Sequence, residues 1–452
     1  MAAEKPASQG DGRVTLVEDK NLNYQERARR VIPGITQLLS KRMDQFSMGV
    51  WPGYFDKATG AEVWDLNGQQ YLDMSISGIG ANILGYCDPE VDQAVHSAVN
   101  KGTSASLNCP EEVVLAETLC ELHPWAENVR FARTGGESMA MAVRIARAAS
   151  GRDKVAFCGY HGWHDWYLAA NLRSDSALSD HLLPGLDPCG VPRALEGSAI
   201  PFRYNHIEDL ERIVAQYRDQ LGVIVMEPIR SESPKPGFLA KVRSIADEIG
   251  AVFVLDEISA GFRLTVGGAH LLLGINPDIA VFSKALGNGY PIAAIIGRQS
   301  IMDVAQKSFI SSTMWTERIG PVAALAVIKK MREKDVCAWI RERGEDVQQI
   351  WRDASEDSAL PVQVSGIPAL SHFSFEDDDG SIKAYYVQLM LEEEILASNR
   401  FYPMYAHSAA HVDRYRSATH RAFSQISSAI VQGLLPSLLR GQPASSGFAR
   451  IA

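Results

Sequence analysis

The sequence lacks the features that mark several protein classes. Its six cysteines include no Cys-x-x-Cys pair and no pair flanked by histidine, so their spacing predicts neither a zinc site nor a disulfide framework. No apolar run reaches the roughly 18 residues of a transmembrane helix, and the first residues do not have the pattern of a secretory signal. We therefore expect a reduced, cytoplasmic protein that does not bind membranes.

An excess of basic residues is also missing. Lys and Arg number 44 against 54 Asp and Glu, which gives a formal net charge of −10, and no basic run interrupts this balance. Because nucleic-acid binding requires clustered cations, the composition argues against a nucleic-acid partner. With 46% hydrophobic and 22% charged residues, the 452-residue chain is typical of a soluble globular protein with a sizeable core.

The middle of the chain alternates helical and strand patterns. Its strand candidates are continuous apolar runs, at 129–132, 155–158, 223–226, 252–255 and 279–282. Unalternated runs favour strands that are buried on both faces, which is typical of a mostly parallel sheet covered by helices. Helical patterns at 139–149 and 239–249 end at Gly151 and Gly250. The sequence therefore predicts an α/β fold.

The flanking regions differ from this middle part. Residues 1–20 predict a flexible tail, and short antiparallel strands are expected between Tyr54 and Asp73. We expect 21–75 to contribute to a smaller α+β domain that is formed mainly by 326–452, with 76–325 as the large domain. The segment 171–201 contains several Pro and Gly residues, and we expect a loop without regular structure that closes over the site.

Three of the apolar runs end in polar residues, namely Glu227, Asp256 and Ser283-Lys284. In a parallel sheet these side chains emerge at the carboxyl edge, where open α/β folds bind ligands. A carboxylate and a lysine in one crevice are what a pyridoxal phosphate (PLP) enzyme requires, because the lysine forms the imine and the acid keeps the pyridine nitrogen protonated. A structural ion pair between Asp256 and Lys284 is the alternative.

Two further segments fit this chemistry. Gly135-Gly136 lies between a strand and a helix predicted to start near Ser138, so backbone N–H groups there could bind a phosphate; a tight turn without a ligand is the alternative. No nucleotide-binding glycine motif is found. In Tyr160-His161-Gly162-Trp163-His164, we expect Tyr160 to stack on a cofactor ring and Trp163 to pack. His161 and His164 lack a third metal ligand, so no metal site is predicted.

Four ordered stretches resemble the class III, fold-type I PLP-dependent aminotransferases, and within them the glutamate-1-semialdehyde aminomutase-like branch. They are Thr134–Ser138, Tyr160–Gly162, Leu255–Arg263 and Pro277–Pro291. The resemblance covers about residues 25–435. It implies a fold-type I PLP-dependent transferase, a large domain with a mostly parallel sheet plus a smaller α+β domain, and a homodimer.

The resemblance also implies roles for individual residues. Lys284 would form the Schiff base with PLP and move the proton during catalysis, while Asp256 would pair with the pyridine nitrogen. The remaining cofactor-binding residues would be Gly135 and Gly136 at the phosphate, Tyr160 and Ile258 on the ring faces, His161, Glu227, and Thr316 from the partner subunit. The segment around Thr316 departs from the family pattern, so Thr313 is the second choice.

The predicted activity is the transfer of an amino group between an amino donor and a carbonyl acceptor by a ping-pong mechanism. Two departures from the family concern the substrate. A Trp that the aminomutases have near Ser77–Gly80 is missing, and Arg230 follows Glu227-Pro228, where it would bind a substrate carboxylate or phosphate or lie on the surface. The alternatives are an intramolecular aminomutase and a PLP-binding regulatory or scaffold protein without turnover.

Overall fold

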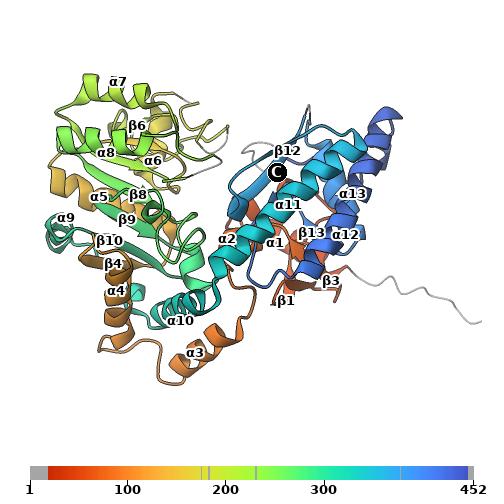
Figure 1. The fold of residues 1–452 in the computed structure, drawn as a ribbon, viewed down its shortest axis with the longest axis horizontal. Coiled ribbons are helices and arrows are strands. Elements are labelled where there is room, and N and C mark those ends of the chain that lie inside the picture. Colours follow the sequence, from red (N-terminus) through yellow and green to blue (C-terminus); the bar gives the residue numbers. More distant parts are fainter. Residues whose placement is uncertain (1–18, 175, 182–183, 230–231, 377, 446–452) are drawn as a thin grey trace, which may run out of the picture.

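The computed structural model describes residues 19–174, 176–181, 184–229, 232–376 and 378–445. Within these residues the largest sheet has seven strands in the order β4-β10-β9-β8-β7-β5-β6 (Figure 1). In chain order the strands are β4 (Asn128–Ala132), β5 (Lys154–Cys158), β6 (Ala199–Pro201), β7 (Leu221–Met226), β8 (Val252–Asp256), β9 (Ile279–Phe282) and β10 (Ala293–Gly297). All five predicted apolar runs form strands of this sheet.

The sheet is parallel from β9 to β6, as predicted, but β10 runs antiparallel to both of its neighbours. The sequence analysis did not predict β10. The short connection from Phe282 to Ala293 explains its direction, because a parallel crossover requires roughly a dozen residues or more. This connection contains the 3₁₀ turn η6 (Lys284–Gly287).

Helices cover both faces of the sheet, which explains why its strands are apolar throughout. Val254 and Val281 pack with α5 (Gly135–Ser150) on one face. On the opposite face, Phe253 packs with α8 (Phe238–Ile249), and Phe282 packs with α4 (Pro110–Leu122) and α10 (Ile319–Lys334). The other helices beside this sheet are α3 (Pro89–Val99), α6 (Asp165–Leu168), α7 (Ile207–Tyr217) and α9 (Gln299–Met302).

Two smaller sheets lie beside the large one (Figure 1). The predicted antiparallel strands form β1 (Phe55–Thr59), β2 (Glu62–Asp65) and β3 (Gln70–Met74), and β13 (Ile395–Ala397) pairs with β3 in parallel. Strands β11 (Val362–Ser365), β12 (Ser371–Phe375) and β14 (Arg400–Phe401) form the antiparallel third sheet. The remaining helices are α1 (Lys20–Val31), α2 (Ser77–Gly80), α11 (Val336–Ser358), α12 (Ser381–Glu392), α13 (Ala409–Val431) and α14 (Leu435–Leu438).

Two predictions about local structure are wrong. Helix α5 begins at Gly135 and not near Ser138, because the Thr134 side chain and Glu137 form a capping box one turn earlier. The segment 171–201 is not entirely irregular, since it ends in β6, which pairs in parallel with β5 at the edge of the sheet. An edge strand tolerates Pro201, which has no N–H to donate.

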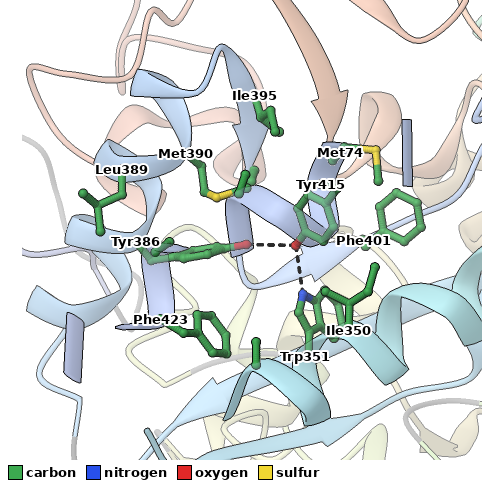
Figure 2. Packing of buried hydrophobic residues seen from close by; sticks show 14 of the residues in the cluster. Met74, Ile350, Trp351, Tyr386, Leu389, Met390, Ile395, Phe401, Tyr415 and Phe423 are labelled. Atoms are coloured by element: carbon green, nitrogen blue, oxygen red, sulfur yellow. Dashed lines mark hydrogen bonds between the residues drawn. The ribbon is translucent and has the colours of Figure 1, made fainter. Parts of the chain in front are cut away.

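The core between α11, α12 and α13 contains a chain of hydrogen bonds, shown in Figure 2. The indole N–H of Trp351 donates to the Tyr415 hydroxyl at 2.8 Å, and that hydroxyl lies 2.8 Å from the hydroxyl of Tyr386. All three side chains are fully buried. A buried polar group that loses its partner costs the full penalty of its desolvation. Tyr415, which bonds to both other residues, should therefore contribute most to stability.

We therefore expect Tyr415→Phe to lower the free energy of unfolding by about 2–4 kcal/mol, because it removes both bonds and leaves the Trp351 N–H buried without this acceptor. Tyr386→Phe is the matched control, since it removes one hydroxyl at the end of the chain and should cost about 1 kcal/mol. Urea unfolding monitored by tryptophan fluorescence measures both. Equal losses for the two variants would contradict this account.

Candidate active site

Lys284 follows β9 at the carboxyl edge of the large sheet. Its backbone is left-handed, with φ = +48°, which is a strained conformation for a residue with a side chain. The amine donates a hydrogen bond to the Ser259 hydroxyl at 2.7 Å. Burial lowers the pKa of Lys284; Asp256 and Glu227 oppose this effect, and Arg263 adds to it. The site therefore makes the neutral, nucleophilic form of the amine more accessible than it is in a free lysine.

Asp256 ends the neighbouring strand β8 and is 4% exposed. One carboxylate oxygen accepts the N–H of Ile258 at 3.0 Å, and the other lies 2.8 Å from Nδ1 of His161. The second ring nitrogen of His161, Nε2, lies 3.1 Å from the carbonyl of Cys158. Both ring nitrogens of His161 therefore have a polar partner. His161 thus fixes the orientation of Asp256.

Gly135 and Gly136 form the first residues of α5 and lie in a crowded turn. A Cβ atom on Gly135 would lie 3.0 Å from the Ile258 side chain, and one on Gly162 would lie 2.7 Å from the Gly136 backbone. The turn therefore has no room for a side chain at Gly162, and a Cβ atom at Gly135 would be in tight contact with Ile258. The N-terminus of a 16-residue helix at this edge presents backbone N–H groups and a positive dipole end, which suit a phosphate.

Tyr160 and Glu227 lie at the ends of β5 and β7. The Tyr160 ring is 41% exposed and packs edge-on against Tyr167, with the ring centroids 6.0 Å apart. The N–H of Tyr160 donates to Glu227 at 3.3 Å. Burial raises the pKa of the Tyr160 hydroxyl, and Asp256 and Glu227 raise it further. The ring therefore stays neutral and remains accessible for stacking.

These contacts show that most of the sequence-predicted site residues come together. The carboxyl ends of parallel strands β5, β7, β8 and β9, with the start of α5, gather them on one edge of the sheet. The residues gathered there are Gly135, Gly136, Tyr160, His161, Glu227, Asp256, Ile258 and Lys284.

One predicted residue among those that the structure describes is not part of this cluster. Thr316 is exposed in the 3₁₀ turn η8 (Thr313–Thr316), where its hydroxyl donates to the carbonyl of Thr313 at 3.1 Å. Its neighbour Trp315 donates to Glu137 at 3.0 Å, so the segment is attached beside the start of α5. Arg230 lies outside the residues that the structure describes.

Sequence reasoning gave no role to Ser259, which accepts the bond from Lys284. The sequence shows only a hydroxyl three residues after Asp256, and this does not indicate that the hydroxyl contacts Lys284. His164 stacks on Trp163 with ring centroids 4.4 Å apart, so it does not join His161. Across the described ranges no group of three or more His, Cys, Asp or Glu residues suits a metal ion, and no helix is long and apolar enough to span a membrane.

Comparisons with known proteins identify the family. Residues 48–423 match the class III aminotransferases. A 3-aminobutyryl-CoA aminotransferase of Cloacimonas acidaminovorans (strain Evry) is 33% identical over 389 residues, or 82% of this chain and 88% of that protein. A glutamate-1-semialdehyde 2,1-aminomutase of Desulfovibrio desulfuricans is 32% identical over 354 residues, or 76% of this chain and 82% of that protein.

A solved structure supports the same fold. The FumI protein of Sphingopyxis sp. MTA144 superimposes with a TM-score of 0.84 at 24% identity, covering 94% of this chain and 99% of that chain. The large sheet with helices on both faces and the two smaller sheets are therefore the architecture of fold-type I PLP-dependent transferases. The chain belongs to the class III aminotransferases, enzymes that use pyridoxal phosphate to transfer amino groups.

Proposed function

We propose that Lys284 and Asp256 carry the amino transfer in this chain. The observation that supports this proposal is their position on adjacent parallel strands at one edge of the sheet, with the Lys284 amine in a site that makes its neutral form more accessible than in a free lysine. The residues present fit PLP. Asp256 is a buried carboxylate, Lys284 is a half-buried lysine after the adjacent strand, and the start of α5 presents Gly135 and Gly136, which have no side chains to cover its N–H groups.

When bound, PLP supplies a ring that accepts the electrons released at the substrate carbon. Lys284 would then hold the cofactor and, once substrate has displaced it, move the proton between the substrate carbon and the cofactor carbon. Asp256, oriented by His161, would keep the pyridine nitrogen protonated. Water exclusion would come from the rest of the site, including the segment 171–201.

The remaining cofactor contacts would follow from the same cluster. Gly135 and Gly136 would bind the phosphate through the backbone, and Tyr160 and Ile258 would lie on the two faces of the ring. Glu227, which accepts a hydrogen bond from the backbone N–H of Tyr160, would lie beside the cofactor next to Tyr160. Arg230 remains a proposed substrate ligand, outside the described residues.

The proposed assembly is a homodimer in the cytoplasm, in which Thr316 of the partner would complete the phosphate site, with Thr313 as the second choice. Exposed apolar side chains beside this segment support an interface, since Phe309 is 92% and Met314 is 58% exposed. Sedimentation at assay concentration measures the oligomeric state, and a fully active monomer would contradict the proposed homodimer. The proposed domains are 76–325 as the large domain and 21–75 with 326–452 as the small one, which the pairing of β3 with β13 supports.

The proposed reaction is an intermolecular ping-pong transfer. We expect a single amino donor labelled with nitrogen-15 to convert the bound cofactor to its amino form, and a chemically distinct carbonyl acceptor to receive the label. Mass spectrometry of both small molecules measures the result. Label confined to an isomer of the donor would instead indicate aminomutation, the activity that the similarity to an aminomutase suggests as second candidate. No conversion of the cofactor by any donor would favour a non-catalytic PLP-binding protein.

A further inference from the structure

Arg263 is a buried cation next to the candidate site that the reaction described above does not use. Its side chain is 1% exposed. Nε donates to the carbonyl of Ser259 at 2.9 Å, and one terminal nitrogen donates to the carbonyl of Gly80. The other terminal nitrogen, Nη1, is buried and has no hydrogen-bond partner among the described residues. A buried guanidinium without a carboxylate is costly, so its presence calls for a reason.

Ser259 connects this guanidinium to Lys284. Its carbonyl accepts from Arg263, and its hydroxyl accepts from the Lys284 amine at 2.7 Å. One residue therefore fixes the positions of both cations. A buried positive charge this close disfavours a second one, so Arg263 opposes protonation of the amine. The geometry and the charge of Arg263 act on the same atom, Nζ of Lys284.

The other contact of Arg263 holds a strained turn. The four residues of α2, from Ser77 to Gly80, all have left-handed backbone angles, with φ of +45° at Ser77 and +61° at Ile79. The Ser77 hydroxyl donates to the carbonyl of Tyr402 at 2.7 Å, which ties the turn to the residues after β14. Such strain persists only where surrounding contacts hold it, and it concentrates at functional sites.

Strain also occurs on the other side of the guanidinium. Phe262, directly before Arg263, has φ = +60°, and Lys284 itself has φ = +48°. Arg263 thus follows one strained residue in the chain, bonds to the end of the strained Ser77–Gly80 turn, and is connected to Lys284 through Ser259. A side chain with this placement ties the segments to one another.

We propose that Arg263 is a positioning residue that holds the Lys284 amine through Ser259 and the Ser77–Gly80 turn through Gly80. This inference rests on the proposed role of Lys284. The groups that face the amine are Asp256, Glu227 and Arg263, and those that face Arg263 are Tyr402 and Cys337. Burial lowers the pKa of Arg263 to about 10, with Tyr402 and Cys337 opposing, so the guanidinium stays charged at neutral pH.

The test compares Arg263→Met, which removes the charge, with Arg263→Lys, which keeps it. In the full chain freed of PLP, an amine-acylating reagent applied over a pH series and mapped by mass spectrometry gives the pH midpoint for labelling of Lys284. Loss of the neighbouring charge raises the amine pKa, so we expect Arg263→Met to shift the midpoint upward by about one pH unit. Arg263→Lys should stay close to the wild-type midpoint.

A second readout isolates the hydrogen bonds. Lysine lacks the planar guanidinium group that bonds to both carbonyls in the wild type. Both variants should therefore capture added PLP at least about tenfold more slowly than wild type, as followed by absorbance. The matched control is Arg243→Met. Arg243 is also mostly buried, but it pairs with Asp247 and Asp278 away from Lys284, so its loss should change neither readout.

The outcomes separate this inference from the proposed function. A wild-type labelling midpoint and a wild-type capture rate in a folded Arg263→Met chain would overturn the role of Arg263. If Arg263→Met does not fold, Arg263→Lys decides through its capture rate, and a wild-type rate there would overturn the role as well. If borohydride fails to trap PLP on Lys284 of the wild type, the proposed function is wrong instead.

Discussion

Replacing Lys284 with alanine is expected to abolish covalent attachment of PLP and to reduce turnover by at least about a thousandfold. The chain would lose both the amine that holds the cofactor and the base that moves the proton. Borohydride reduction followed by peptide mapping measures attachment, and wild type should carry the reduced adduct on Lys284. An adduct on another lysine of the wild type would contradict the assignment.

Lys330 provides the matched control for this experiment. It is a buried lysine that lies 2.7 Å from Asp88 and 2.9 Å from Glu90. Burial alone would lower the pKa of Lys330, whereas these two carboxylates raise it above its ordinary value. Lys330→Met should therefore keep the PLP adduct on Lys284, even where stability falls.

The direction of the Lys284 pKa shift predicts how the capture of PLP depends on pH. Its pKa lies below the ordinary value of 10.5, and the amine is reactive only when unprotonated. Capture of PLP by the cofactor-free wild type should therefore rise with pH and level off below pH 10.5. A rate that keeps rising beyond that pH would show that the site does not make the neutral amine more accessible than in a free lysine.

Asp256→Asn is expected to keep the fold and bound PLP but to lower turnover by about a hundredfold to a thousandfold. The amide has nearly the same shape, but it cannot hold the pyridine nitrogen as a cation, so the ring accepts electrons poorly. Single-turnover absorbance changes with an amino donor measure the loss at the chemical step. Turnover within about threefold of wild type would show that Asp256 does not have this role.

Asp278→Asn is the control for this substitution. Asp278 is a buried aspartate that pairs with Arg243 at 2.9 Å, but it lies just before β9, at the opposite edge of the sheet from Lys284. Its loss should reduce the thermal midpoint and leave the turnover of the folded enzyme unchanged. The pair of variants separates a charge required for chemistry from one required for stability.

The sequence was sufficient to predict five of the seven strands of the large sheet and the edge where Glu227, Asp256 and Lys284 lie. Runs such as Val252–Leu255 are apolar throughout because both faces of their sheet are covered, and three of the runs are followed at once by polar residues that emerge at the edge. That relation is local in the chain, so it is visible without knowledge of the fold. The strand candidates and Asp256, Glu227 and Lys284 follow from it.

The contacts that could not be predicted depend on distances between segments far apart in the chain. Nothing near Ser259 indicates that its hydroxyl meets Lys284, and nothing near Arg263 indicates that it meets Gly80. Two other differences were local and could have been read from the sequence: the short connection that makes β10 antiparallel, and the Thr134–Glu137 capping box at the start of α5. Thr316 was chosen from the family resemblance, and its proposed role needs a second subunit that one chain does not contain.

The pairing of β3 with β13 has a consequence for how the chain is made. Leu72 of β3 pairs with Ile395, so the amino-terminal strands leave the ribosome long before the strand that completes their sheet. Met74 and Leu72 also share a core with Trp351 and Phe401. Until the last part of the chain is synthesised, these early apolar side chains have no permanent cover, which is the period when a nascent chain is most prone to aggregate. We therefore expect the sheet of β1, β2 and β3 to be completed only after β13 has been synthesised, so a chain truncated before residue 395 would leave Leu72 and Met74 without part of their core.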